Sequence, residues 1–370
     1  MRWFGPGFAV FTLGGCLGNP GSIDGEPEGT TSSAPATDTG SSTAAQSTTG
    51  SAAETSGCFF CGSSGAPDAE SDGEPDGDGS LRVATWNILR VDEPGSPQFE
   101  ALLDIVLRID ADVLCLQEVG EGEESWLQEL AESGGYIDGL LAPFSGPDGI
   151  GIANACMSRT PVDDAAYLWS NWISADDDAR DLTRPFVRLR LRVPGSDRYI
   201  SVVTAHLKAG GGEVDRFRRM VEHVRLGQAA LNEFAEFPDN AVVILGDLNE
   251  GEDPSPTVFD ALPPGLPSFY ELGNDITLPL TYEPAKPLLD AGLTRVETSY
   301  DETFIPDSRR LDYVYAGAAE IVAAEVYDAC RDGGDEGPDE GVEKAGAPLD
   351  CGQSELASDH RPVVVDLQLR

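Results

Sequence analysis

The stretch Val242–Asn249, which reads Val-Val-Ile-Leu-Gly-Asp-Leu-Asn, constrains the fold more than any other part of the chain. Four consecutive apolar residues, three of them β-branched, predict a short buried strand. Asp247 and Asn249 follow Gly246, and the alternation of side chains along an extended backbone points both to one side. Their oxygens suit a hard cation such as Mg²⁺, and their burial is costly unless they bind a partner. An ordinary turn after a strand is the alternative, and only the other segments decide between the two.

Polar residues stand near the ends of several further predicted strands. The strands predicted at 81–88, 112–118, 199–208 and 309–315 carry Asn87, Glu118, His206 and Asp312. Asp359 and His360 directly precede a last strand predicted at 363–369. In a layered α/β sandwich such ends can converge on one cleft. Acids, amides and two imidazoles together supply metal binding and acid–base catalysis.

The remaining periodicity predicts the elements that support this cleft. Helices are expected at 98–109, 123–133 and 213–234, and further strands at 149–159, 165–173, 181–193 and 321–327. The third helix is predicted to bury one apolar face, made of Phe217, Met220, Val221, Val224 and Leu231. Its beginning holds the densest positive charge of the chain, Arg216, Arg218, Arg219 and Arg225. His223, in the middle of this helix, is expected to be solvated, and residues 251–306 give no clear pattern.

The amino-terminal region indicates export. Residues 1–16 have one cation and then a short apolar run, and Leu13-Gly-Gly-Cys16 resembles a bacterial lipobox, which would attach a lipid to Cys16. Residues 17–80 hold eleven acidic residues, no Lys or Arg, and many Gly, Ser, Thr, Ala and Pro, and we expect a disordered tether. Residues 81–370 are long enough for one large α/β domain, expected to be a monomer in the cell envelope.

The cysteines agree with an exported protein. Cys330 and Cys351 flank an acidic, Gly-rich segment, and a disulfide between them would close it. Cys58 and Cys61 favour a small local disulfide over a zinc half-site, because no second Cys or His pair lies nearby. Cys115 and Cys156 stand in apolar strand-like runs, which favours buried free thiols.

Six short motifs occur in an order that resembles the endonuclease/exonuclease/phosphatase superfamily, whose members are similar to pancreatic-type DNase and abasic-site endonucleases. They cover residues 81–369 and read Thr85-Trp-Asn87, Leu116-Gln-Glu118, Thr204-Ala-His206, Gly246-Asp-Leu-Asn249, Leu311-Asp-Tyr313 and Ser358-Asp-His360. Each motif alone is weakly specific, but all six are present. The resemblance implies a four-layered α/β/β/α sandwich of two mixed sheets flanked by helices. It also implies phosphoester hydrolysis with Mg²⁺ or Mn²⁺.

The same resemblance suggests roles for the residues. Glu118 looks like the principal metal ligand, with Asn87 and Asp359 beside it. Asn249 would donate to a nonbridging phosphate oxygen, and His206 would stabilise the transition state or protonate the leaving oxygen. Two candidates remain for the base that activates water, because either His360, held by Asp312, or Asp247 could take the proton.

The motifs specify the bond and not the molecule. We expect an extracytoplasmic phosphodiesterase or nuclease, acting on DNA, RNA or another phosphodiester. A formal net charge of −31 over residues 81–370 disfavours tight, nonspecific binding of long nucleic acid. The alternatives are a phosphomonoesterase, a lipid phosphodiesterase of sphingomyelinase type, for which Trp169 and Trp172 are the only membrane-facing aromatic candidates, and a catalytically inactive surface-binding lipoprotein.

Overall fold

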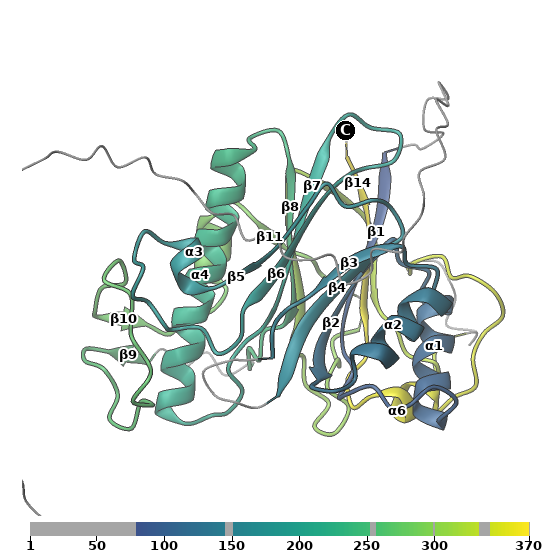
Figure 1. Ribbon diagram of the computed structural model, residues 1–370, viewed down its shortest axis with the longest axis horizontal. Helices are drawn as coiled ribbons and strands as arrows, with labels where there is room; N and C mark the ends of the chain where they lie inside the picture. The colour runs from purple at the N-terminus through teal and green to yellow at the C-terminus, as the bar shows by residue number, and fades with distance from the viewer. Residues whose placement is uncertain (1–78, 145–150, 252–256, 299, 333–340, 370) are drawn as a thin grey trace, which may run out of the picture. The chain divides into compact units, whose positions relative to one another are not determined.

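A computed structural model describes residues 79–144, 151–251, 257–298, 300–332 and 341–369. Within these ranges two six-stranded sheets pack face to face, and helices cover the outer face of each (Figure 1). This arrangement confirms the predicted α/β/β/α sandwich. The predicted signal, its Cys16, the tether and the pair Cys58 and Cys61 lie outside the described residues.

The first sheet has the strand order β13-β14-β1-β2-β4-β3. Its strands are β1 (Ser80–Asn87), β2 (Val113–Gly120), β3 (Asp138–Leu141), β4 (Ile152–Ser158), β13 (Glu320–Val326) and β14 (Val363–Gln368). The sheet is mixed, because β1 runs parallel to β2 and antiparallel to β14. The polar ends of β1 and β2 therefore lie at the same edge.

The second sheet has the order β11-β12-β8-β7-β6-β5. Its strands are β5 (Asp164–Leu168), β6 (Phe186–Arg192), β7 (Tyr199–His206), β8 (Ala241–Asp247), β11 (Thr294–Arg295) and β12 (Asp312–Gly317). Strands β7 and β8 are parallel, and β12 runs antiparallel to β8. A separate short ladder joins β9 (Val258–Phe259) to β10 (Leu280–Thr281).

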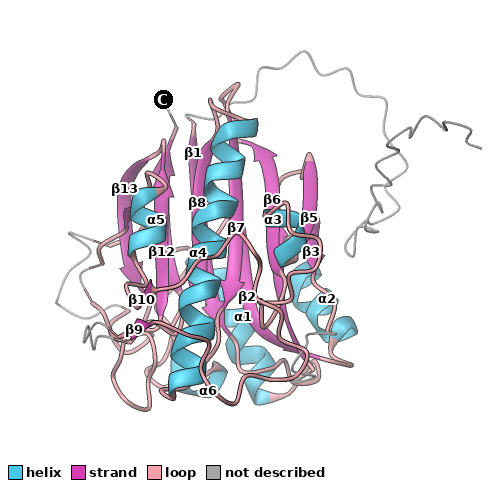
Figure 2. Cartoon of the chain, turned by 90° about the vertical axis from the view of Figure 1, so that its left-hand side faces the viewer, coloured by secondary structure: helices cyan, strands magenta, loops and turns pink. Residues whose placement is uncertain are grey.

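Helices close both outer faces. Helices α1 (Pro97–Ile109), α2 (Glu124–Ser133) and α6 (Gln353–Ala357) lie on the side of the first sheet, and α3 (Ser170–Ile173), α4 (Glu213–Glu236) and α5 (Lys286–Asp290) on the side of the second. Figure 2 shows α4 lying along the second sheet in front of β7 and β8. Between the sheets, Val113, Val202 and Val314 belong to one buried apolar cluster. None of the helices in the described ranges is long and apolar enough to cross a lipid bilayer.

Three predictions about local structure were wrong. The strand predicted at 165–173 ends at Leu168, and α3 follows it, with the Ser170 hydroxyl accepting a hydrogen bond from the amide of Asp181. Leu231 is 51% exposed, because Leu226 and Ala230 fill that part of the buried face of α4. His223 is fully buried instead of solvated.

The cysteine predictions had mixed outcomes. Cys330 and Cys351 form the predicted disulfide. Cys115 and Cys156 are also joined by a disulfide, so the expectation of free thiols was wrong. The two residues are register partners on the antiparallel strands β2 and β4, which brings their Cα atoms to 4.0 Å. This pairing depends on the strand register, which neither apolar run reveals by itself.

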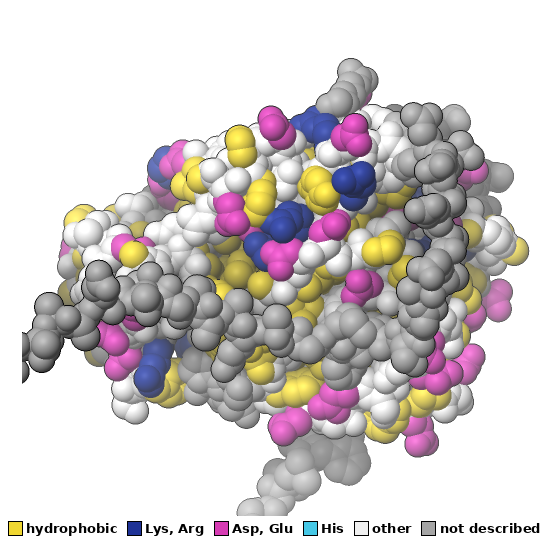
Figure 3. Space-filling view, turned by 45° about the horizontal axis from the view of Figure 1, so that its top comes forward, with side chains coloured by type: hydrophobic (Ala, Val, Ile, Leu, Met, Phe, Trp, Pro, Cys, Tyr) yellow, Lys and Arg dark blue, Asp and Glu magenta, His cyan; other side chains and the backbone are white. Residues whose placement is uncertain are grey.

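The surface agrees with the acidic composition. In Figure 3, Asp and Glu side chains are spread over the displayed face, with a smaller number of Lys and Arg side chains among them. Several arginines are neutralised locally; Arg188 on β6 is paired with Asp164 and Glu233.

Candidate active site

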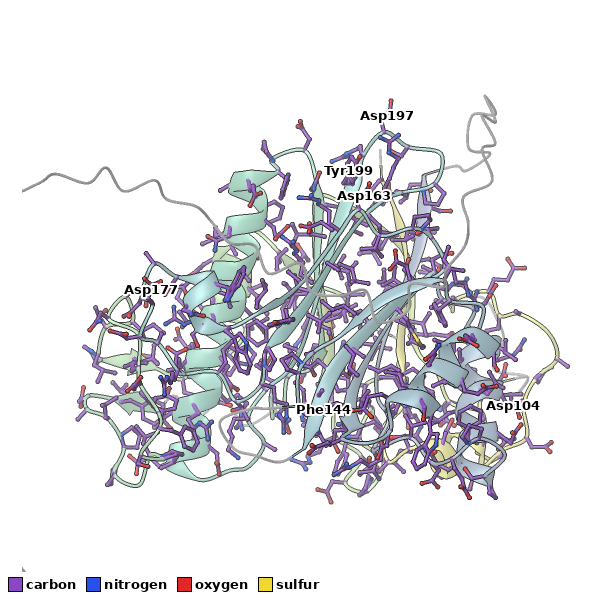
Figure 4. The ribbon with its side chains drawn as sticks, in the orientation of Figure 1. Asp104, Phe144, Asp163, Asp177, Asp197 and Tyr199 are labelled. Atoms are coloured by element: carbon purple, nitrogen blue, oxygen red, sulfur yellow. A yellow bond between two sulfur atoms is a disulfide. The ribbon has the colours of Figure 1, made fainter. Side chains whose placement is uncertain are left out.

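Three candidate residues lie in a single row across the second sheet. The parallel pairing of β7 with β8 places His206 beside Asp247, and the antiparallel pairing of β8 with β12 places Asp312 on the other side of Asp247. Neighbouring strands are about 4.8 Å apart, so the register alone brings an imidazole and two carboxylates together. The row lies at the carboxyl end of β7, whereas Tyr199, labelled near the top of Figure 4, marks its amino end.

The residue before Asp247 must be a glycine. Gly246 has a φ of 143°, and a Cβ atom at this position would lie 1.9 Å from the carbonyl oxygen of Ala205 on β7. The close approach lets the two strands end side by side with His206 and Asp247 in register. The Gly246-Asp-Leu-Asn motif therefore needs its glycine for the close approach of β7 and β8.

Asp247 lies at the centre of the contacts. Its Oδ2 atom is 3.4 Å from His206 Nε2 and accepts a hydrogen bond of 3.0 Å from Asn87 Nδ2. Its Oδ1 atom accepts the backbone N–H of Asn249 at 3.0 Å, and the Asn249 side chain donates to the carbonyl of Leu207. Asn249 has a left-handed φ of 49°, a conformation that asparagine tolerates better than most residues. Residues from both sheets thus meet at this carboxylate.

Glu118 joins the cluster from the first sheet. It has a φ of 64°, and the pairing of β2 with β4 shifts register between Leu116 and Val119. Its Oε1 atom accepts from Asn87 Nδ2 at 3.1 Å and is 3.8 Å from His206 Nε2. The Asn87 side-chain oxygen accepts the backbone N–H of Leu89. Asn87 therefore presents its side-chain nitrogen to both Glu118 and Asp247.

His360 and Asp312 form a buried pair. The Nδ1 atom of His360 is 2.7 Å from Asp312 Oδ2, and its Nε2 atom is 3.9 Å from Asp247 Oδ2. The His360 ring packs against Phe304 with 4.9 Å between ring centroids, and its backbone carbonyl accepts from the indole nitrogen of Trp86 at 2.8 Å. These contacts fix the orientation of the imidazole.

The surroundings of three ionisable groups shift their pKa values in different directions. Burial, aided by the charge of Arg184, lowers the pKa of His206 well below its usual value. Burial, reinforced by the charge of Asp312, raises the pKa of Asp247 to about 7. Burial alone would lower the pKa of His360, but Asp312 and Asp247 outweigh it and raise that pKa to about 10. Near neutral pH, His206 is therefore neutral, His360 is protonated and Asp247 titrates.

These groups open into a pocket of about 560 Å³. Six of the eight predicted site residues line it: Glu118, His206, Asp247, Asn249, Asp359 and His360. Asn87 and Asp312 lie directly behind, hydrogen bonded to Asp247 and His360. The structure thus brings all eight together, while their individual roles remain predictions.

The donor set fits a divalent cation. Asp247, Asp312 and His360 offer ligand atoms within 4.8 Å of one another, although Asp312 already holds His360. Glu118 and Asp359 line the same pocket, and Asp359 Oδ1 is buried without a hydrogen-bond partner in the part of the chain that the structure describes. Carboxylate oxygens of this kind are the ligands that Mg²⁺ and Mn²⁺ prefer. The acids of the pocket could therefore bind a metal ion.

Several supporting residues were missed by the sequence reasoning. Arg184 donates to the carbonyl of His206, and the buried Gln117 amide donates to Thr85 and Thr204. The pocket is also lined by side chains without a predicted role, namely Arg216, Arg219, Tyr282, Phe304 and Arg309. The cationic beginning of α4 was a usable signal for Arg216 and Arg219, but Tyr282 and Phe304 stand in the stretch without a readable pattern.

The fold and the set of side chains in the pocket are those expected of a phosphoester hydrolase. The sequence profile of the Endonuclease/Exonuclease/phosphatase family matches residues 84–360. The chain therefore belongs to the endonuclease/exonuclease/phosphatase family.

Solved structures agree on the fold. An endonuclease/exonuclease/phosphatase from Bacteroides vulgatus is 16% identical with a TM-score of 0.52, covering 79% of this chain and 99% of that chain. The human Nocturnin catalytic domain with bound sulfate is 18% identical with a TM-score of 0.51, covering 79% and 94%. No match was found among curated proteins.

Proposed function

We propose that the protein is an extracytoplasmic phosphodiesterase or nuclease that depends on Mg²⁺ or Mn²⁺. The observation that carries the proposal is the row of His206, Asp247 and Asp312. Glu118 faces this row from the other sheet, and His360 is paired with its member Asp312. Such a set provides metal binding, proton transfer and charge stabilisation within one pocket.

Glu118, Asn87 and Asp359 would hold the metal ion. When bound, the ion would polarise the phosphate oxygens and stabilise the leaving group. Asp359 Oδ1 is buried and unpartnered among the described residues, which suits a ligand. For Asn87 to join, its side-chain oxygen would exchange the N–H of Leu89 for the ion.

The protonation states favour Asp247 over His360 as the base. Asp247, whose pKa is about 7, can take the proton of the attacking water near neutral pH. His360 is protonated under those conditions and would donate from Nε2 to a nonbridging oxygen, while Asp312 keeps its Nδ1 side in place. Neutral His206 would donate to the charge that develops on the phosphate or the leaving oxygen. Asn249 would orient a nonbridging oxygen.

The location proposal concerns residues outside the described ranges. A lipid on Cys16 would anchor the protein to a membrane, and the acidic tether would hold a monomeric domain away from that surface. The lipobox-like Leu13-Gly-Gly-Cys16 and the composition of residues 17–80 support this proposal. Cys16→Ser tests it directly.

One observation supports a lipid phosphodiesterase as the second candidate. A cavity of about 310 Å³ shares Asp359 with the central pocket and is lined by the half-exposed Leu89 and Leu356. Trp172 does not belong to this area. Trp172 is next to Ile173, whose carbonyl accepts a hydrogen bond from the Asn232 side chain of α4. Asn232 lies about 24 Å along this helix from Arg216, which lines the central pocket, so Trp172 is far from that pocket. An exposed aromatic so far from the site would not insert a lipid into it.

An activity panel separates the candidates. The purified protein would be assayed with and without Mg²⁺ on bis-p-nitrophenyl phosphate, p-nitrophenyl phosphate, plasmid DNA, RNA and sphingomyelin, with His206→Gln as the inactive control. Metal-dependent cleavage of the diester or the nucleic acids supports the proposal. Cleavage of sphingomyelin or of the monoester alone would move the assignment to that alternative. Inactivity on every substrate would favour the surface-binding scaffold.

A further inference from the structure

One arginine at the pocket is buried and forms no ion pair among the described residues, although its charge acts on the nearby Glu250. Arg219 on α4 lines the pocket and is only 5% exposed. Its Nη1 atom donates to the carbonyls of Lys208 at 2.7 Å and Gly210 at 2.8 Å, and its Nε atom donates to the Tyr282 hydroxyl at 2.8 Å. Over the described ranges of the chain, no carboxylate lies within ion-pair distance of this guanidinium, and its Nη2 atom has no partner.

Several other buried arginines are paired with an acid. Arg108, Arg225 and Arg361 each form an ion pair with an aspartate. A buried cation without a counter-charge is costly, and a positioned anion would offset that cost. Arg219 forms no ion pair among the described residues and lines the candidate active site, so an anionic ligand bound there would offset the cost of its burial.

A second cation reinforces the same spot. Arg216, one turn before Arg219 on α4, also lines the pocket and lies over the Tyr282 ring at 4.9 Å from its centroid, while Arg219 lies at 5.6 Å. Both guanidinium groups therefore lie close to the Tyr282 ring. The planar fork of a guanidinium group matches the oxygens of a phosphate.

The spot lies next to the reacting centre. Arg219 contacts the carbonyl of Lys208, which is two residues beyond His206 and so at most about 7 Å along the chain. We propose that Arg219, with Arg216 and Tyr282, binds a second phosphate of the substrate, adjacent to the phosphate that is cleaved. This inference rests on the proposed phosphodiesterase function and names its substrate class: small nucleotides that carry a neighbouring phosphate. A pocket of about 560 Å³ suits a small ligand, and the net negative domain disfavours long polyanions.

Two substrates that differ only in the second phosphate test the proposal. Thymidine 5′-(p-nitrophenyl phosphate) and its 3′-phosphorylated form release the same chromophore. The expected kcat/KM is about tenfold or more higher for the 3′-phosphorylated form, mainly through KM, because hydrogen bonds to charged groups contribute that much. Arg219→Gln should abolish this preference, and Arg219→Lys should retain part of it. Should Arg219→Gln fail to fold, Arg216→Gln and Arg219→Lys must still reduce the preference.

Arg192 offers a matched control. Like Arg219, it donates to a tyrosine hydroxyl, that of Tyr199 at 3.2 Å, and lies over the same ring at 5.4 Å. Tyr199 marks the end of β7 remote from the site (Figure 4). Arg192→Gln should therefore leave the preference unchanged.

Binding without metal gives an independent readout. Calorimetric titration of the metal-free protein with thymidine 3′,5′-bisphosphate and thymidine 5′-monophosphate should show at least tenfold tighter binding of the bisphosphate, lost in Arg219→Gln. If neither substrate is hydrolysed, the proposed function is overturned. Selective binding of the bisphosphate would still support the subsite in that case. Equal kcat/KM and equal affinities, or an Arg219→Gln variant that weakens both ligands alike, would overturn the subsite and leave Arg219 as a brace for the Lys208–Gly210 loop.

Discussion

The buried His223 predicts a specific loss of stability in mild acid. The ring is fully buried on α4, and neither of its nitrogens has a hydrogen-bond partner among the described residues. Burial, with the nearby charge of Arg219, lowers the pKa of His223 from 6.5 to about 3. The unfolded chain therefore binds a proton below about pH 6.5, while the folded chain does not until about pH 3. Stability must fall as the pH is lowered through this window.

The size of the effect follows from the two pKa values. At pH 8 the residue contributes almost nothing, because it is neutral in both states. At pH 5 the unfolded state is favoured by a factor of about 30, which corresponds to about 2 kcal/mol. In His223→Leu this contribution is absent, so the free energy of unfolding should fall by about 2 kcal/mol less between pH 8 and pH 5 than it does in the wild type.

Urea unfolding at the two pH values measures this difference directly. The carboxylates that also titrate are present in both proteins and cancel in the comparison. Val221→Ala is the matched control, since Val221 is an equally buried apolar residue on the same helix. It should lower stability by the same amount at both pH values. If the wild type and His223→Leu lose equal stability between pH 8 and pH 5, His223 is solvated or partnered, and the reasoning is wrong.

Three further predictions concern the proposed activity and location. Glu118→Gln should reduce hydrolysis by orders of magnitude and raise the Mg²⁺ requirement with thermal stability retained; unchanged metal dependence would remove it from the site. The rate should rise with pH through about 7, and Asp247→Asn should abolish this rise. His360→Ala should lower the rate by about 10²–10³-fold, the cost of one lost donor to the developing charge, while the rise with pH remains. The rate should also decline at high pH, where His360 loses its proton, and Asp312→Asn should lower the pKa of His360 and so move this decline to lower pH. If His360→Ala instead abolishes the rising limb, His360 is the base. Cys16→Ser should shift the protein from the membrane fraction to the soluble one, and equal partitioning would refute lipid attachment.

The parts of the structure that follow local rules were predictable. The apolar runs before Glu118 and Asp247 indicated buried strands, and the side chains at their ends indicated a shared cleft, because a polar group placed there needs a partner. The six motifs then implied the two-sheet sandwich that the structure confirms. Spacing also placed Phe217, Met220 and Val221 on one face of α4.

The parts that depend on distant pairing were not predictable. The Cys115–Cys156 disulfide requires the register of β2 with β4, which two apolar runs do not encode. Arg219 meets Tyr282 across 63 positions of sequence, and Tyr282 stands in the stretch 251–306 without a readable pattern. His223 was judged by its polarity, although it lies three positions from Met220 on the buried face.

The row of His206, Asp247 and Asp312 is held by a different part of the fold from the side chains proposed to select the substrate. The spacing of its members is set by backbone pairing between strands and is insensitive to the length or composition of any loop. Arg216 and Arg219, in contrast, come from a helix, and Tyr282 from a segment outside both large sheets. Changes in these outer elements can alter which molecules are held while the reacting groups stay in place. In evolution, such a chain can acquire new substrates through changes in α4 and in the segment around Tyr282, while the row of reacting groups is kept.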